Sequence, residues 1–201
     1  MNTEISNIIE ASLFAAGESL TVNELQNLFS VEDRPDKRRV KECLEQLQQD
    51  YQEKPIELIE TASGFRFQVR TKYADWVSRL WEEKPVKYGR ALLETLAIIA
   101  YQQPATRGEI EEIRGVSVST NVIRTLLERE WVNVIGHKEV PGKPALYATT
   151  KEFLDYFSLQ TLAELPPLAT LQNIDILKAT DIQLKLGEEA VEPEGATNEE
   201  E

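Results

Sequence analysis

The chain has 201 residues, of which 41% are hydrophobic and 28% charged, and its formal net charge is −13. This composition is typical of a globular protein with a packed core and excludes a fibrous or wholly disordered chain. No apolar run approaches the roughly 20 residues that a membrane-spanning helix needs, and the first residues lack the basic and apolar regions of a signal peptide. We therefore expect a cytoplasmic protein that has no contact with a membrane.

The negative charge is unevenly distributed. Asp and Glu outnumber Lys and Arg by 16 to 11 over residues 1–86 and by 10 to 2 over 161–201, whereas residues 87–160 carry 9 of each. The last segment thus holds −8 of the −13. A net negative charge argues against general affinity for nucleic acid, because neutralising phosphates supplies most non-specific binding.

The first part of the chain predicts three helices followed by a hairpin. Apolar residues at helical spacing predict a helix over 5–16 that ends near Gly17, a second over 22–29, and a third that begins around Pro35 and buries Cys43. The apolar period then changes to two over 56–58 and 65–69, around a turn at Ser63-Gly64. This order is that of a winged helix-turn-helix. An added helix over 72–81 precedes a charged linker at 82–87.

The same unit recurs 85 residues later. Leu13, Phe14, Thr21, Glu24 and Leu25 align with Ile98, Ile99, Thr106, Glu109 and Ile110. In both copies a Thr-x-x-Glu follows an apolar helix, and this pattern predicts a capping box at the start of the next helix. Because the two capping boxes occupy equivalent positions, we predict the same fold for both copies.

The second copy predicts helices over 90–101, 107–114 and 118–130, strands over 131–135 and 145–149 around a long wing tip at 136–144, and a helix over 151–159. Residues 188–201 are rich in Glu and have almost nothing to bury, which predicts disorder. We therefore expect an α+β, mainly helical fold: two tandem winged helix-turn-helix domains, 1–84 and 85–160, and an extension over 161–201 that is acidic and disordered toward its end.

Catalysis has little support in the sequence. The single histidine, His137, lies in the wing tip, and the sequence contains no Gly-rich phosphate loop and no spacing typical of metal ligands. Glu109, Glu111 and Glu112 are interpreted as a cap residue and a solvated helix face rather than as active-site carboxylates. We expect no catalytic residue, no cofactor and no metal.

DNA binding is the serious alternative, because the third helix of a helix-turn-helix enters the major groove. In the first copy a basic cluster lies at the start of the third helix and could make a weak DNA contact: Lys37, Arg38, Arg39 and Lys41. In the second copy, Arg124 and Arg129 on the third helix are accompanied by Glu128 and Glu130, and a DNA reader would show a clear basic face. Mixed charge favours a protein partner, but a tandem winged-helix transcriptional regulator stays open.

Several segments resemble the segregation and condensation protein B (ScpB) family. They are ALLETLAIIAYQQP at 91–104, RGV at 114–116, PGKPALYATT at 141–150, the Phe153-Leu154 pair and LAELP at 162–166. A looser, collinear match covers EASLFAAGE at 10–18, IET at 59–61 and Gly64. The wing sequence Gly136-His137-Lys138 departs from the Gly-Arg-Lys run frequent in the family, and the acidic tail extends past the usual end.

The resemblance implies a non-enzymatic subunit of the bacterial SMC condensin that acts in chromosome condensation and segregation at the nucleoid. It implies a homodimer paired through the first domain, whose second domain clamps the kleisin ScpA, which in turn bridges the heads of the SMC ATPase. For the kleisin-facing surface we expect Arg107, Arg114, Val116, Arg124 and Tyr147, with core packing as the alternative for Val116 and Tyr147. For the dimer interface we expect Trp76, Leu80 and Trp81, because Trp is enriched in protein interfaces.

Overall fold

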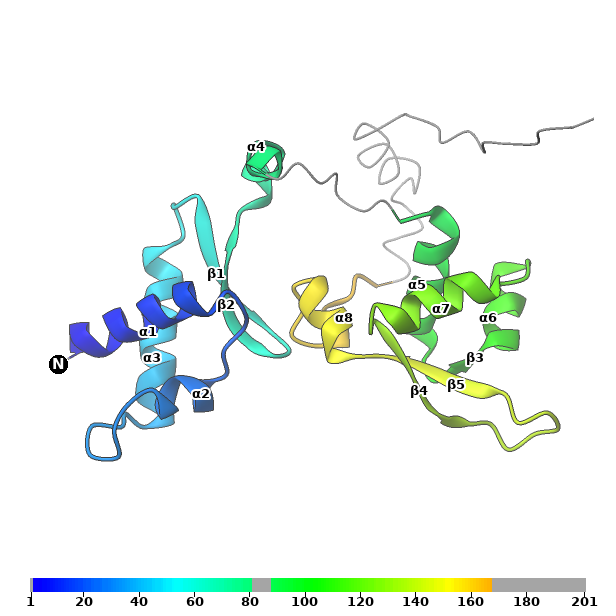
Figure 1. The fold of residues 1–201 in the computed structure, drawn as a ribbon, viewed down its shortest axis with the longest axis horizontal. Helices are drawn as coiled ribbons and strands as arrows, with labels where there is room; N and C mark the ends of the chain where they lie inside the picture. The colour runs from blue at the N-terminus through cyan, green and yellow to red at the C-terminus, as the bar shows by residue number, and fades with distance from the viewer. Residues whose placement is uncertain (1, 81–87, 168–201) are drawn as a thin grey trace, which may run out of the picture. The chain divides into compact units, whose positions relative to one another are not determined.

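The computed structural model describes residues 2–80 and 88–167, and it contains the same order of elements twice (Figure 1). Each copy has three helices followed by an antiparallel hairpin, so the predicted winged-helix fold is confirmed. The proposed linker at 82–87, Trp81 and the acidic stretch at 188–201 lie outside the described residues.

The first winged helix consists of α1 (Asn2–Ala16), α2 (Val22–Asn27), α3 (Lys37–Asp50), β1 (Ile56–Thr61) and β2 (Gly64–Val69). Thr21 caps α2 with the expected capping box, since its side chain accepts from the Glu24 N–H while the Glu24 carboxylate accepts from the Thr21 N–H. The core draws on α1, α2, α3 and the hairpin: Ile9, Leu13, Leu25, Val40, Cys43, Leu44, Leu47, Tyr51, Leu58 and Phe65. Burial of the Cys43 thiol raises its pKa, in agreement with a core residue.

The hairpin of the first winged helix is anchored to the segment before α2. Leu20 and Phe65 exchange two backbone hydrogen bonds of 2.9 Å. Gly64 makes this approach possible, because a Cβ built on it would lie 2.4 Å from the Leu20 carbonyl oxygen, and its φ of +130° disfavours any other residue.

The second winged helix consists of α5 (Arg90–Gln102), β3 (Ala105–Thr106), α6 (Arg107–Arg114), α7 (Thr120–Glu128), β4 (Val132–His137), β5 (Ala145–Thr149) and α8 (Lys151–Tyr156). A short 3-10 helix, Leu162–Glu164, follows. The three strands are antiparallel in the order β3-β5-β4. A separate core lies beneath them: Leu92, Leu96, Ile99, Ala100, Ala105, Ile110, Val118, Ile123, Leu126, Trp131, Val132 and Phe153.

The structure corrects three expectations. Pro35 is not in the first turn of α3, because Asp36 is the N-cap and accepts from the Arg39 N–H. The single helix expected over 72–81 is three short pieces, namely 3-10 turns at Thr71–Tyr73 and Ser78–Leu80 on either side of α4 (Ala74–Val77), and none of these residues is buried. The two-residue strand β3 was not expected, since a pair of residues carries no periodic signal.

Candidate functional site

The turn between α6 and α7 is exposed except at Val118. Gly115 ends α6 in the left-handed conformation with φ of 72°, and Ser119 begins α7 by accepting from the Val122 N–H. Between them Val118 is fully buried and anchors the turn to the core. This anchoring leaves Val116 directed away from the core and 58% exposed.

Arg107 and Glu111 brace this turn from α6. The Arg107 Nε lies 3.0 Å from the Glu111 Oε1, and its Nη2 donates to the Val118 carbonyl. The same Glu111 oxygen accepts from the Val118 N–H at 2.9 Å. The Val118 hydrogen bond and then Arg107 hold the pKa of Glu111 below its usual value. Arg107, predicted to face the kleisin, thus also fixes the shape of the turn.

Arg114 links the turn to α5. Its side chain is only 8% exposed and its Nη2 lies 3.1 Å from the Glu94 Oε2 of α5. Its Nη1 donates to the Ser117 carbonyl at 3.4 Å. Hydrogen bonds from Arg90 and Arg114 lower the pKa of Glu94 against the effect of burial. A partner chain would reach little of Arg114, so its placement favours a positioning role for the exposed residues around it.

Two exposed apolar side chains make this turn a candidate binding surface. Ile113 is 55% exposed and precedes Val116 by three residues, on the other side of the Gly115 cap. Ile113 was not predicted from the sequence, although an apolar residue beside Glu111 and Glu112 on an exposed helix face was the available signal. We call Ile113 and Val116 the apolar corner.

The two other predicted kleisin-facing residues lie elsewhere on the second winged helix. Arg124 is exposed on α7 and pairs with Glu128 at 3.4 Å. Tyr147 is in the middle of β5, opposite Val134 and Ala105, and is partly buried against the core. Tyr147 therefore takes part in the core packing that the sequence left open.

The wing of the second copy is tied back to its own helix. The Lys138 Nζ lies 2.6 Å from the Glu109 Oε1, so the carboxylate of the capping box also pairs with the wing. The hydrogen bond from Lys138, followed by those from Thr106, lowers the pKa of Glu109 to about 2. A wing lysine paired in this way presents less net positive charge to DNA than an unpaired one.

The basic cluster of the first copy lies at the start of α3, as expected. Arg38 and Arg39 both pair with Glu42, at 3.0 and 2.9 Å, and these bonds lower the pKa of that carboxyl group. Lys37 and Lys41 are exposed on the same turns. The cluster therefore presents Lys37, Lys41 and the 87% exposed side chain of Arg38 to solvent, although both arginines are paired with Glu42.

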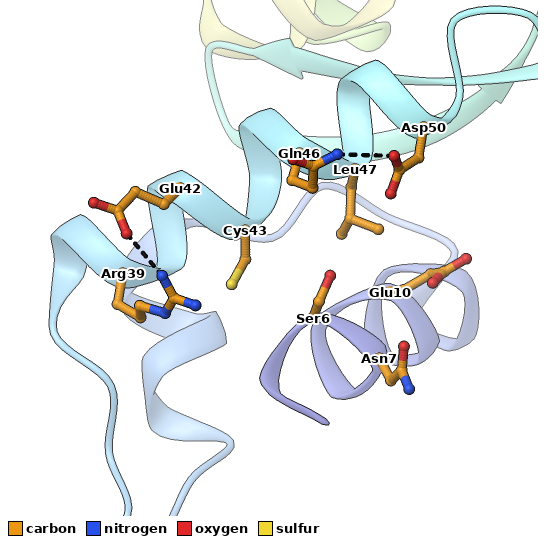
Figure 2. A pocket seen from close by; sticks show the side chains of 9 residues that line it. All are labelled: Ser6, Asn7, Glu10, Arg39, Glu42, Cys43, Gln46, Leu47 and Asp50. Carbon is orange, nitrogen blue, oxygen red and sulfur yellow. Dashed lines mark hydrogen bonds and ion pairs between the residues drawn. The ribbon is translucent and has the colours of Figure 1, made fainter. Parts of the chain in front are cut away.

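A groove of about 430 Å³ lies beside this cluster, between α1 and α3 (Figure 2). Figure 2 shows Cys43 and Leu47 along the α3 side, with Ser6, Asn7 and Glu10 opposite them on α1. Arg39 is bonded to Glu42 at one end, and Gln46 is bonded to Asp50 at the other. The polar groups of α3 that line this groove are thus largely paired with one another.

The residues expected at a dimer interface are exposed where they are described. Trp76 on α4 is 64% exposed and Leu80 is 77% exposed. Trp81 lies outside the described residues. Large apolar side chains at such exposure are available for a partner, so the dimer prediction remains compatible with the structure.

Within residues 2–80 and 88–167, no group of three or more His, Cys, Asp and Glu side chains is placed to hold a metal ion. Nor is any helix there both long and apolar enough to cross a membrane.

Comparison with known proteins gives one consistent result. A family model for "Segregation and condensation complex subunit ScpB" matches residues 7–168. A segregation and condensation protein B homolog from Coxiella burnetii is 52% identical over 172 residues, which cover 86% of this chain and 82% of the relative. Among solved structures, ScpB from Mycobacterium tuberculosis is 31% identical, with 79% of this chain and 98% of that chain covered and a TM-score of 0.37. A dimer of the ScpB N-terminal domain complexed with a ScpA peptide is 27% identical, covering 39% of this chain and 96% of that one, with a TM-score of 0.35.

Proposed function

The chain belongs to the ScpB family of segregation and condensation complex subunits, and from this membership we propose that it is a non-enzymatic accessory subunit of the SMC-ScpA-ScpB condensin. In this role it binds the kleisin ScpA, reaches the SMC ATPase through ScpA, and acts in chromosome condensation and segregation. The family match over 7–168 carries the proposal. The ATP chemistry belongs to SMC, so this chain needs no cofactor, and its place is the nucleoid in the cytoplasm.

We assign ScpA binding to the second winged helix, at the apolar corner. Ile113 and Val116 supply the exposed apolar surface that a fully desolvated contact requires, and Arg124 lies exposed on the following helix. Arg107 and Arg114 position the turn from α6. The corner is thus a preformed surface, which reduces the entropy lost on binding.

A direct test mixes the purified protein with the middle fragment of ScpA on a sizing column. We expect a stable complex at micromolar concentration and a loss of affinity of roughly tenfold or more in Val116→Glu, because a carboxylate would be buried without a partner. Val31→Glu is the matched control, since Val31 is an exposed valine of the first winged helix. Absence of co-elution with the parent protein would overturn the proposed function, while equal binding by Val116→Glu would overturn the corner alone.

We assign homodimer formation to the first winged helix and the segment after its hairpin. The exposed Trp76 and Leu80 are the anchors, since buried Trp side chains dominate many interfaces. Sedimentation analysis of Trp76→Ala should show a weaker dimer than the parent protein or Val31→Ala. A dimer unchanged by Trp76→Ala would remove this residue from the interface.

Sequence-specific DNA recognition is the second candidate, and the paired charges of the second winged helix weigh against it. Arg124 pairs with Glu128 on α7, and Lys138 pairs with Glu109 at the wing. The exposed Lys37 and Lys41 of the first copy support a weak, non-specific contact only. Salt-sensitive binding to one DNA sequence far above random DNA would favour the regulator instead.

A further inference from the structure

The outer face of the first hairpin carries polar groups that its own core does not use. Strand alternation places Phe65 and Phe67 on the core side of β2 and directs Arg66 and Gln68 to the opposite face. The turn at Ala62 and Ser63 adds two backbone N–H groups beside them. The Gln68 amide donates to Glu57 on β1, whereas Arg66 and the two N–H groups need partners from outside the first winged helix wherever they are shielded from water.

The partners come from α8 and the residues that follow it. The Ser63 N–H donates to the Asp155 Oδ1 at 3.0 Å, and the Ala62 N–H donates to the Leu159 carbonyl at 3.0 Å. The Arg66 Nη2 donates to the Asp155 carbonyl at 2.8 Å and to the Ser158 Oγ at 3.3 Å.

Ser158 contributes a further hydrogen bond to this contact. The Ser158 Oγ also donates to the Gln68 Oε1 at 3.2 Å, so the hydroxyl bridges two side chains of β2. Ser158 itself has a φ of +57°, and the N–H groups of Ser158 and Leu159 donate to the Asp155 and Leu154 carbonyls, as in a Schellman cap at the end of α8. The chain thus turns sharply after α8 and returns toward the hairpin.

The second winged helix fixes the other side of the contact. Phe153 of α8 is buried in its core, and Leu159 packs against the same core. Each hydrophobic core is closed by its own residues, and the two share none. The connection between them in this region is therefore made by hydrogen bonds, which depend on geometry, rather than by a common apolar core.

The electrostatics of Asp155 agree with a formed contact. Burial would raise its pKa, but hydrogen bonds from Ser63 and Thr61, together with the charge of Arg66, lower it on balance. The carboxylate is thus stabilised in its charged form by groups of the other winged helix.

We propose that these residues form a latch, here called the wing latch, which holds the two winged helices in one fixed orientation. It consists of Ala62, Ser63, Arg66 and Gln68 from the first winged helix and Asp155, Ser158 and Leu159 from the second. Its consequence is a set distance between surfaces on the two winged helices, so that a partner spanning both meets a rigid body.

Amide exchange in the full-length protein tests the latch directly. In Asp155→Ala the amides of Ala62 and Ser63 should exchange about tenfold faster, as expected for the loss of a charge-assisted hydrogen bond. The amide of Phe65, which bonds within the first winged helix, should not change. Glu152→Ala is the matched control, because Glu152 is an exposed acid on the same helix.

Distances between the winged helices provide the second measurement. Spin labels are attached at Lys41→Cys and Glu128→Cys in a Cys43→Ala background, and labelled chains are diluted with unlabelled protein so that only distances within one chain are recorded. We expect one narrow distance distribution in this background and in Glu152→Ala, and a broad one in Asp155→Ala.

A second variant separates loss of the latch from loss of the fold. Arg66→Lys keeps the positive charge, but its side chain is one atom shorter and draws the donor away from the Asp155 carbonyl and Ser158, so it should broaden the distribution even if Asp155→Ala fails to fold. A broad distribution without any latch substitution, or a narrow one in both Asp155→Ala and Arg66→Lys, would overturn the proposal. No partner protein is present in either measurement, so the result does not depend on the proposed function.

Discussion

Residues at equivalent positions of the two winged helices make different hydrogen bonds and ion pairs. Gln26 and Glu111 occupy corresponding positions, since 111 − 26 = 85, and both hold the connection to the third helix. Gln26 donates to the Pro35 carbonyl at 2.8 Å, whereas Glu111 accepts from the Val118 N–H and pairs with Arg107.

The capping boxes differ in the same way. The described hydrogen bonds of the Glu24 carboxylate are to Thr21 alone, whereas Glu109 also binds Lys138 from the wing. Both copies therefore keep the same helices and capping boxes, while charged residues of the second copy also pair with one another within the domain. The apolar corner is the surface of this copy that we propose for a partner.

The largest expected effect tests whether the scaffold is equally essential in both copies. Leu25 and Ile110 are fully buried at equivalent positions of the repeat. Leu25→Ala and Ile110→Ala should each lower the free energy of unfolding by about 2–5 kcal/mol, because each leaves a cavity in a separate core. Chemical denaturation measures this.

The repeat also supplies matched controls for these substitutions. Leu28 and Ile113 are equivalent to each other, since 113 − 28 = 85, and both are about half exposed. Leu28→Ala and Ile113→Ala should change stability little, although Ile113→Ala should weaken ScpA binding. Equal destabilisation by buried and exposed substitutions would contradict the two-core description.

The N-caps come next in expected size. Thr21→Ala and Thr106→Ala should each lower the free energy of unfolding by about 1 kcal/mol through loss of the capping hydrogen bond. The effect should be larger at Thr106, because this residue is buried and Thr21 is exposed. Thr21→Ser and Thr106→Ser keep the hydroxyl and should restore most of the stability in thermal melts. A larger loss of stability in Thr21→Ala than in Thr106→Ala would contradict the effect expected from burial.

The sequence predicted best what depends on neighbouring residues. Both capping boxes were found because Thr and Glu stand three residues apart, and α6 begins and ends at the predicted residues. β3 was missed because Ala105 and Thr106 become a strand only by pairing with β5, about forty residues later.

The burial of Arg114 could not be predicted from neighbouring residues either. Its ion pair with Glu94 joins residues 20 apart, so the sequence suggested an exposed arginine where the structure has a nearly buried one. The Lys138–Glu109 pair spans 29 residues in the same manner. Local patterns therefore predicted the elements, while long-range pairing decided which charges remain free for a partner.

A third prediction concerns the wing pairing and is measured as a pKa. In Lys138→Ala the pKa of Glu109 should rise from about 2 toward that of Glu24, which is lowered by Thr21. Because the pKa is depressed in the folded state, the associated stability is present above the ordinary value of 4.5 and is lost as pH falls toward 2. In Lys138→Ala this loss should still begin near 4.5, but it should be smaller and complete at a higher pH, because only the folded-state pKa is raised. Carboxyl NMR titration with Glu24 as internal reference provides the measurement, and an unchanged Glu109 would contradict the pairing.

The smallest expected effect concerns DNA, and it tests whether the two copies differ in free positive charge. Weak binding to random duplex DNA should depend on Lys37 and Lys41, so that Lys37→Ala or Lys41→Ala reduces the slope of log K against log salt by about 0.9 for each lost phosphate contact. Lys138→Ala should leave the slope nearly unchanged, because that lysine is already paired with Glu109 at 2.6 Å. An equal change in slope for the three variants would mean that the ion pair with Glu109 does not keep Lys138 from contacting phosphate. A change for Lys138→Ala alone would make the second copy, rather than the first, the one that meets DNA.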